Sequence, residues 1–297
     1  MIPYSFDIKM DLLSDWREFL ISQFKRFPFL KQQDYINLPL EKLSILYFKW
    51  LNRMIQPAIR KVHYSKEFSC PANLEKGLEE IAYKIQIGQE LTSHLTRSIK
   101  DITYNDGLLN DWGIHHLHLG VEEERDGFVK RNGDVLYALF NDNDAYLIQI
   151  MDHKSFSKQE LVRILHRNWS ETISKYRSNG INSLGSTLTD EDIHANRKAG
   201  ANSLIEIDGV IYFPMGGGLT TAGTNVLAMR ESDISIKWLE INEEHIRKNI
   251  NEYVRDVTQK LGYQPNELEF KLLSNTEDNF FVYEKNSLIA FDIGKPY

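Results

Sequence analysis

The chain has 297 residues, of which 42% are hydrophobic and 26% are charged. These values are typical of a globular protein of one or two domains with a sizeable core. The formal charge of −7 argues against binding of nucleic acid over the whole surface. A single cysteine, Cys70, excludes an internal disulfide and a multi-cysteine zinc site. The first sixteen residues lack a secretory-signal pattern, and no apolar run approaches the ~20 residues of a membrane span. We therefore expect a cytoplasmic protein with no membrane segment.

Residues 1–60 predict a helical segment. Apolar residues recur at a helical spacing over 8–26 and 39–56, and Pro57 ends or kinks the second helix. We expect the aromatic residues of both helices in the core. The stretch 17–66 carries ten Lys and Arg against three Asp and Glu. This excess predicts either a surface for phosphate or an acidic partner, or a helical pair whose acidic complement lies elsewhere in the fold.

Residues 61–178 predict a central antiparallel sheet with a helix pair, followed by one further helix. The stretch 134–140 is apolar on both faces, which indicates a central strand, and the turn NDND joins it to the next strand. Ser157 and Glu160 predict a capping box. The expected elements are a strand at 60–68, helices at 70–85 and 89–99, turns at 104–111, strands at 112–120, 134–140 and 145–151, a short strand at 128–131, and a helix at 157–176.

The linker 178–186 is the expected boundary of a C-terminal region, 186–297, and the whole chain is expected to be α+β. Thr189 and Asp192 predict a second capping box. The glycine-rich loop 215–225, with Gly216–Gly218, could cradle an anion or simply pack tightly, and it lacks the phosphate-loop motif. The other expected elements are a hairpin turning at Asp208-Gly209, a short strand at 226–229, a helix at 243–261, and strands at 267–273, 279–285 and 287–293.

The stretch WGIHHLHLG (112–120) holds three histidines within four positions. In a strand, side chains alternate between faces, so His116 and His118 share a face with Ile114. His115 lies on the opposite face, which is the more apolar of the two. We therefore expect His116 and His118 to be the more exposed pair.

Three interpretations of this pair remain open. Neutral imidazoles bind a metal ion when a third ligand is near, and Asp111, Asp152 and His153 are candidates for it. One neutral and one protonated imidazole can instead act as base and acid near pH 7. In the third interpretation the histidines are structural and form hydrogen bonds at a partly buried sheet edge.

The region 61–154 also resembles a known fold. HHLHLG is followed by GFVKRNGDVLYALFNDNDAYLIQIMDHK, which places basic residues before one strand of a hairpin and His and Lys after the other. This text and the order of elements resemble the RelE/ParE endoribonuclease toxins. Lys130, Arg131, His153 and Lys154 are the matching positions. The resemblance covers under a third of the chain, and the C-terminal half has no counterpart in that pattern.

The resemblance implies a metal-independent endoribonuclease, a toxin or anti-phage effector that acts on RNA without a cofactor. It also implies a protein partner, such as an antitoxin or another subunit of an effector complex. Cleavage by the RNA 2′-hydroxyl needs a base, an acid and cations around the phosphorane. His116 or His118 is the expected base, His153 the acid, and Arg131 and Lys154 the phosphate clamp. The alternatives are a non-catalytic interaction module, which docks through its basic segment, and a metal-dependent hydrolase with His116 and His118 as ligands.

Overall fold

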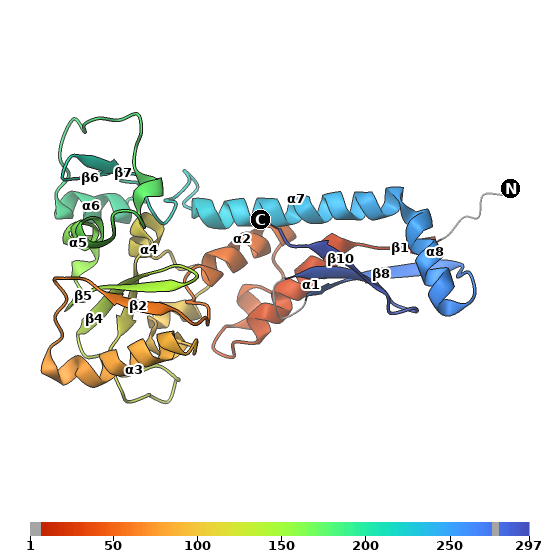
Figure 1. Cartoon of the computed structure of the whole chain (residues 1–297), viewed down its shortest axis with the longest axis horizontal. Helices are drawn as coiled ribbons and strands as arrows, with labels where there is room; N and C mark the ends of the chain where they lie inside the picture. Colours follow the sequence, from red (N-terminus) through yellow and green to blue (C-terminus); the bar gives the residue numbers. More distant parts are fainter. Residues whose placement is uncertain (1–6, 275–278, 297) are drawn as a thin grey trace. The chain divides into compact units, whose positions relative to one another are not determined.

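The computed structural model describes residues 7–274 and 279–296, and its elements form two compact units. Unit 1 comprises Met1–Phe48 and Met229–Tyr297, and unit 2 comprises Lys49–Ala228. Helices and strands occur in blocks, with one mixed four-stranded sheet in each unit, so the predicted α+β class is confirmed (Figure 1). The predicted linker 178–186 lies inside unit 2, where the Ser178 amide donates to the carbonyl of Ile211, 2.8 Å away.

The main sheet of unit 2 has the order β2-β5-β4-β3. Its strands are β2 (Lys61–Tyr64), β3 (His115–His118), β4 (Asp134–Phe140) and β5 (Asp144–Asp152). The strands β3, β4 and β5 are antiparallel as predicted, and β4 is central. The strand β2 instead pairs with β5 in parallel, because the long segment between them returns the chain to the same end of the sheet. At the hairpin turn, Asn141 Oδ1 accepts the amide of Asn143 at 2.9 Å, as the Asn- and Asp-rich sequence predicts.

Helices cover both faces of this sheet. The helix α3 (Glu75–Gln86) covers one face, and α4 (Gly107–Trp112), α5 (Glu160–Trp169) and α6 (Asp190–Lys198) lie on the other (Figure 1). The helix α3 approaches closely at Gly77, where a Cβ would lie 2.0 Å from the carbonyl oxygen of Leu119. Trp112, Ile114, Tyr137 and Leu161 belong to the core on the α5 side. Because both faces are covered, even the edge strand β3 is largely buried.

Three local predictions in this unit are wrong. The expected helix at 89–99 is instead two single 3-10 turns, η3 (Thr92–His94) and η4 (Arg97–Lys100), because the Thr96 side chain caps a new turn at Ser98. The expected turns at 104–111 contain α4, which Asp106 caps through the amide of Leu109. The expected strand at 128–131 forms only an isolated bridge between Glu123 and Val129.

The second half of unit 2 follows the sequence more closely. The Thr189–Asp192 capping box is present at α6, and β6 (Ile205–Ile207) and β7 (Val210–Tyr212) form the expected hairpin. At its turn, Asp208 and Gly209 both have positive φ, as a tight hairpin requires. The Ser157–Glu160 capping box is wrong: Ser155–Ser157 forms a 3-10 turn (η5), α5 starts at Glu160, and a separate 3-10 turn (η6, Ser174–Tyr176) follows it.

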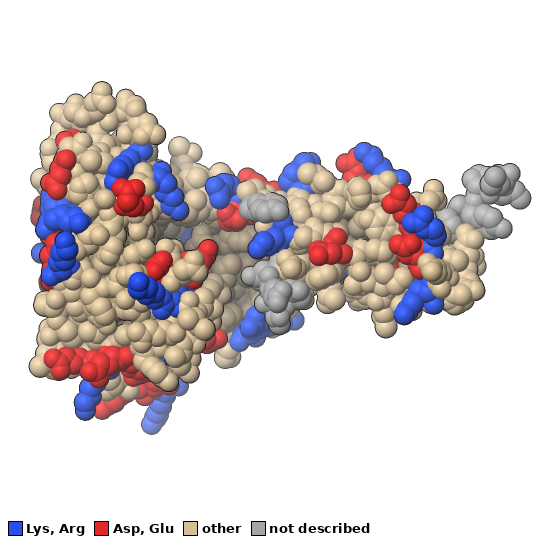
Figure 2. All heavy atoms as spheres, viewed as in Figure 1, with Lys and Arg blue, Asp and Glu red and all other residues tan. Residues whose placement is uncertain are grey.

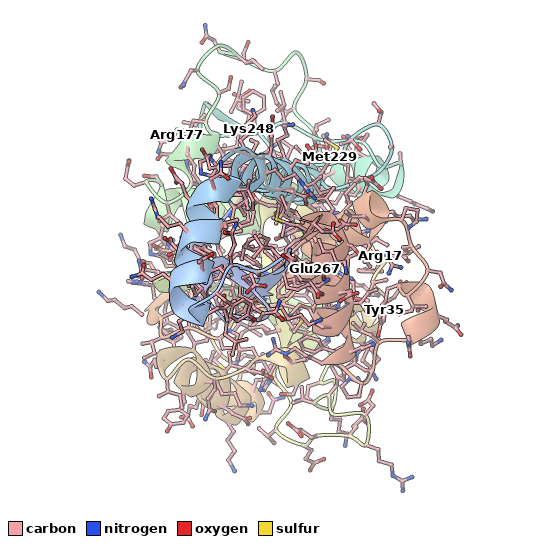
Figure 3. The ribbon with its side chains drawn as sticks, turned by 90° about the vertical axis from the view of Figure 1, so that its right-hand side faces the viewer. Arg17, Tyr35, Arg177, Met229, Lys248 and Glu267 are labelled. Atoms are coloured by element: carbon pink, nitrogen blue, oxygen red, sulfur yellow. The ribbon has the colours of Figure 1, made fainter. Side chains whose placement is uncertain are left out.

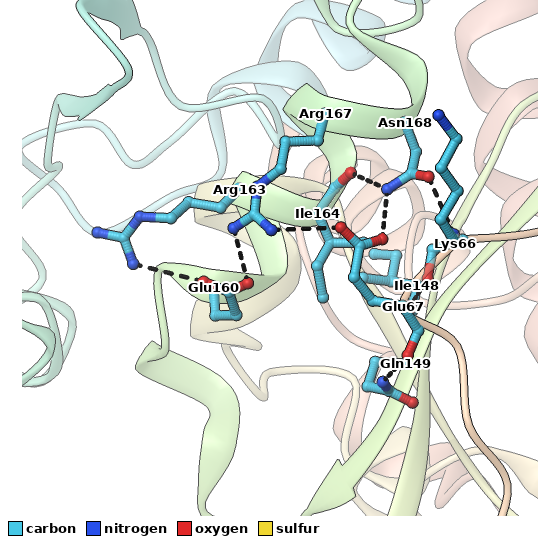
Figure 4. Close-up of polar contacts among 10 residues, drawn as sticks. Lys66, Glu67, Ile148, Gln149, Glu160, Arg163, Ile164, Arg167 and Asn168 are labelled. Atoms are coloured by element: carbon cyan, nitrogen blue, oxygen red, sulfur yellow. Dashed lines mark hydrogen bonds and ion pairs between the residues drawn. The ribbon is translucent and has the colours of Figure 1, made fainter.

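A polar network joins α5 to the chain just after β2. The carboxylate of Glu67 accepts from Asn168 Nδ2 at 2.7 Å and from Arg167 Nη1 at 3.2 Å (Figure 4). The backbone carbonyl of Glu67 accepts from Gln149 of β5 at 2.7 Å. Charged and amide groups therefore fix the β2 side of the sheet to its covering helix.

Unit 1 contains the two N-terminal helices, as predicted: α1 (Leu12–Lys25) and α2 (Leu40–Leu51), which continues into unit 2. Trp16, Phe24 and Tyr47 are buried, which confirms that these aromatic residues belong to the core. The ring of Trp16 meets that of Phe280 edge-on at 5.7 Å. A 3-10 turn, η1 (Gln32–Asp34), lies between the two helices.

The sheet of unit 1 has the order β1-β8-β9-β10. The strands β8 (Glu267–Ser274), β9 (Phe280–Glu284) and β10 (Ala290–Gly294) confirm the three C-terminal predictions. The strand β1 (Asp7–Lys9) was not predicted, and it pairs in parallel with β8 from the other end of the chain.

Two C-terminal predictions need correction. The expected strand at 226–229 is the start of a long helix, α7 (Val226–Lys248), because Asn225 Oδ1 accepts the amide of Ala228 and caps it. A helix therefore begins just after the glycine-rich loop. The expected helix at 243–261 is divided between the end of α7 and α8 (Ile250–Leu261). Within 7–274 and 279–296, no helix has the length and apolarity needed to cross a bilayer.

Several basic side chains of the stretch 17–66 donate hydrogen bonds to backbone carbonyls of the same chain. Arg17 donates to the carbonyl of Ile36, next to Tyr35 (Figure 3), and Arg53 donates to the carbonyls of Ser98 and Asp101. On the face drawn in Figure 2, Lys and Arg are interspersed with Asp and Glu. Some of the basic groups in this stretch therefore stabilise the fold through hydrogen bonds.

Candidate functional site

The strand β3 presents two histidines on one face. His116 is paired with Tyr137 of β4 and His118 with Val135, and the centroids of the two imidazole rings lie 6.0 Å apart. His115 points to the opposite face, where its ring meets Phe140 edge-on at 5.6 Å. The predicted division of the three histidines between two faces is therefore confirmed.

His153 joins this pair from a different strand. It directly follows β5, whose last residue, Asp152, is paired with the first residue of β4. The ring centroid of His153 lies 5.5 Å from that of His116 and 5.6 Å from that of His118. One ligand nitrogen from each of the three rings lies within 4.8 Å of the others. Three of the five predicted site residues thus converge.

The predicted exposure of the pair is wrong. His116 is 8% exposed and His118 is 3% exposed, whereas His153 is partly exposed. The segment after β5 folds back over the histidines, and the ring of Phe156 lies 4.7 Å from those of His116 and His153. The contact of Phe156 with the histidines was not predicted from the sequence. It depends on the turn at Ser155–Ser157, which places the Phe156 ring against His116 and His153.

Three imidazole nitrogens of this cluster have no hydrogen-bond partner in the part of the chain that the structure describes. Both ring nitrogens of His118 and the Nε2 of His153 are buried without a hydrogen bond to any described residue. Burial is the main cause that lowers the pKa of each of the three histidines, and the nearby positive charge of Arg131 adds to it; together with the neighbouring groups they lower the pKa of His118 to about 3. The three rings are therefore neutral at pH 7, which is the state in which an imidazole binds a metal ion.

The other predicted residues lie around this histidine cluster in different ways. Arg131 is exposed just before β4, and its charge acts on all three rings. Lys154 is also exposed, and its backbone amide binds Asp152 Oδ1 at 2.7 Å. Arg131 is thus a neighbour of the histidine cluster, while the structure records no side-chain contact of Lys154 with it.

The two acidic candidates for a third ligand have other contacts. Asp111 is buried in α4 and paired with Arg197, with 2.8 Å between Oδ2 and Nε. The carboxylate of Asp152 accepts from the amide of Lys154 and, at 3.3 Å, from the hydroxyl of Ser155. Of the three candidates named from the sequence, only His153 lies in the cluster of converging nitrogens.

The glycine-rich loop packs against α4 and does not present its amides. The amides of Gly216 and Gly218 donate to the carbonyls of Asp111 and Asn110, at 3.2 and 2.8 Å. A Cβ on Gly216 would lie 1.7 Å from the carbonyl oxygen of Leu109. Of the two interpretations of this loop, tight packing is the one that the structure supports.

Neutral imidazole nitrogens suit the binding of a cation when they are held by β3 and by the residue that directly follows β5 and are partly covered by an aromatic ring. Those of His118 and the Nε2 of His153 have no partner among the described residues. Among the described residues, no carboxylate is paired with a histidine of this cluster. An acid–base pair commonly uses such a carboxylate to orient its imidazole. Comparison of the chain with protein-family models, with curated proteins and with solved structures finds no match to any of them.

Proposed function

We propose that His116, His118 and His153 bind one divalent transition-metal ion, and that the chain uses it to hydrolyse negatively charged esters. RNA phosphodiesters are the first substrate to test, because RNA is the substrate that the sequence resemblance implies. The single observation that carries the proposal is the convergence of three ligand nitrogens within 4.8 Å, in a cluster where both nitrogens of His118 and the Nε2 of His153 have no partner among the described residues.

The geometry is compatible with a tetrahedral ion. Zinc–nitrogen bonds of about 2.0–2.1 Å place two ligand nitrogens roughly 3.4 Å apart. The nitrogens of the histidine cluster lie within 4.8 Å of one another, so the longest separation exceeds that spacing by no more than about 1.4 Å. Three protein ligands leave a fourth position for water, which is the arrangement of catalytic zinc sites.

The charge of the site supports hydrolysis of an anion. Three neutral imidazoles leave the full double charge on the ion, which lowers the pKa of a bound water to about 7. In the reaction, the water oxygen bonds to phosphorus while the bond from phosphorus to the leaving oxygen breaks. One proton of the water passes to solvent, and the leaving oxygen takes one up. Arg131, exposed beside the cluster, supplies a positive charge for the phosphate.

The metal-independent mechanism uses the same residues and remains the competing hypothesis. It needs one imidazole protonated at neutral pH to act as the acid. Burial lowers the pKa of all three histidines, so the protonated form is disfavoured at each. This is why we prefer a metal centre to an acid–base pair.

Metal content and titration test the first half of the proposal. Purified protein should contain close to one equivalent of a transition metal, or take up one equivalent of Co²⁺ with the visible absorption of a tetrahedral site. The variants His116→Ala, His118→Ala and His153→Ala should lose this binding. His194→Ala, on the exposed face of α6, is the matched control and should retain it. If the wild-type protein takes up no metal, the proposal is overturned.

An RNA cleavage assay tests the second half. Cleavage that EDTA abolishes and added metal restores supports a metal-dependent hydrolase. Cleavage that persists in EDTA but is lost in His153→Ala would establish the metal-independent mechanism in its place. Metal binding without cleavage of RNA or of a simple phosphodiester refutes the hydrolase and leaves a structural metal centre.

A further inference from the structure

A cavity in unit 2 lies at the other end of β3 from His118. Its volume is about 320 Å³, which falls within the range of small-molecule sites. Gly113, which precedes β3, and Phe140 and Asn141, at the end of β4, contribute to its wall. Because all its lining residues belong to unit 2, the cavity is a feature of that unit alone.

One side chain in the cavity wall has an unused donor. Asn110 is 8% exposed, and its Nδ2 is buried without a hydrogen-bond partner among the described residues. Its orientation is fixed by Asn225, whose Oδ1 accepts the amide of Ala228 and whose Nδ2 donates to Asn110 Oδ1 at 3.0 Å. Asn225 Nδ2 also donates to the carbonyl of Gly216 at 2.9 Å, so exchanging the oxygen and nitrogen of either amide would break bonds. The orientation of the Asn110 amide is therefore fixed, and its Nδ2 is an unpartnered donor within the wall of the cavity among the described residues.

The charge of the wall is positive. Among the described residues that line the cavity there are two lysines, Lys49 and Lys175, and no Asp or Glu. Lys49 is buried, and its ammonium group donates to the carbonyl of Thr103. Burial, with a smaller contribution from the charge of Arg53, lowers the pKa of Lys49 to about 8. The carboxylate of Asp101 raises the pKa of Lys49 in part, and an anion in the cavity would add a second counter-charge.

The remaining wall suits a flat organic group. Leu139, Met215 and Leu227 provide apolar surface, and Phe140 and Tyr176 provide aromatic rings. Aromatic side chains stack on nucleobases, asparagine amides pair with the edges of bases, and lysines bind phosphate. The cavity combines all three groups in a space of suitable volume.

We infer that this cavity is a binding site for a mononucleotide, with its base against the apolar and aromatic wall, an acceptor on the base facing Asn110 Nδ2, and its phosphate at Lys49 and Lys175. The inference does not rest on the proposed metal centre. It assigns a ligand site to residues that the histidine cluster does not use.

Calorimetric titration of the full chain with AMP, GMP, CMP and UMP tests the inference. EDTA is present throughout, so that metal held by the histidine cluster cannot bind the phosphate. At least one mononucleotide should bind, and its nucleoside should bind about tenfold or more weakly because the charge-assisted bonds are lost. Absence of binding by all four overturns the inference. So does equal binding of inorganic phosphate or benzoate, which would show a site for simple anions.

Matched variants locate the binding. Asn110→Asp keeps the oxygen that Asn225 needs but replaces the unused donor with a negative charge, and it should abolish binding. Lys175→Gln, at an exposed position, should weaken binding about tenfold, whereas Lys158→Gln, exposed outside the cavity, should not. Thermal unfolding checks that each variant is folded. If Asn110→Asp does not fold, Lys175→Gln against Lys158→Gln decides, and equal binding by these two places the ligand elsewhere.

Discussion

The two edges of the main sheet carry histidines in opposite states. On the β2 edge, His63 Nε2 lies 2.7 Å from Asp144 Oδ1, and its ring stacks on Tyr146 at 5.1 Å between centroids. On the β3 edge, His116 and His118 are buried, and both ring nitrogens of His118 lack a partner within residues 7–274 and 279–296. Burying a polar group without a partner makes folding less favourable, which suggests another role for the group. A hydrogen-bonded partner offsets this cost. The β3 edge is therefore the candidate functional edge of the sheet.

The largest difference between the two edge strands should be in the free energy of unfolding lost when an apolar side chain is truncated. Leu117 is fully buried, so Leu117→Ala should lower the free energy of unfolding by about 2–5 kcal/mol. Val62 on β2 is only half-buried, and Val62→Ala should cost about 1 kcal/mol or less. Urea unfolding of both variants measures the difference. Equal losses would mean that the two edge strands are equally buried.

Metal affinity gives the next largest effect. Loss of a group that merely orients a metal ligand costs about 10–100-fold in affinity, so loss of the ligand in His118→Ala should cost roughly a hundredfold or more. His63→Ala removes a histidine from the same sheet that already has a carboxylate partner, and it should leave metal affinity unchanged. Calorimetric titration with Zn²⁺ compares them. Similar losses in both variants would contradict a site on the β3 edge.

The basic residues near the histidine cluster should have smaller and unequal effects. Arg131→Ala should reduce kcat/KM for an anionic ester about tenfold, because one charge-assisted contact to phosphate is lost. Lys154→Ala should change it by no more than about twofold, since the structure shows its side chain exposed and without a recorded contact to the cluster. Steady-state kinetics on one substrate measure both. A larger effect for Lys154→Ala would favour the phosphate clamp predicted from the sequence.

The smallest effect concerns the charged network beside β2. Burial raises the pKa of Glu67, but the hydrogen bond from Asn168 and the charge of Arg167 outweigh it, so the pKa lies below its ordinary value. Glu67 therefore stabilises the fold above its unfolded-state pKa, and this contribution is lost as the pH falls through the lower, folded-state pKa. Glu67→Gln should cost under about 1 kcal/mol at pH 7 and almost nothing in acid. Denaturant unfolding at several pH values checks this, with the exposed Glu90→Gln as control; a cost that does not change with pH would refute it.

Much of the local structure could be predicted because it depends on neighbouring residues. The hairpin from β4 to β5, the turn at Asp208-Gly209 and the capping box at Thr189 follow from short-range turn and cap chemistry. Some failures are local as well, because the caps at Thr96, Asp106 and Asn225 were not recognised. Others arise where a residue far along the chain decides the structure. Gln159, not Ser157, is the N-cap of α5, and its backbone amide is bound by Asp190 of α6 at 3.0 Å.

The candidate site shows the same division. The alternation of side chains along a strand predicted that His116 and His118 share a face. The sequence also indicated His153 as a possible third ligand, and it lies in the cluster. Their burial was not predictable, because it depends on the turn at Ser155–Ser157, which returns Phe156 to the cluster. The cavity at Asn110 was also not predictable, since its wall comes from segments more than a hundred residues apart.

The sequence by itself therefore determined the α+β class, most of the strands and the shared face of the two histidines, because periodicity and turn chemistry act over a few residues. The tertiary structure decided the parallel pairings of β2 with β5 and of β1 with β8, which join distant segments. It also decided which polar groups found partners: Asp111 met Arg197, whereas His118 met none among the described residues. Pairing across the fold depends on where packing places each group, and no local pattern contains that information.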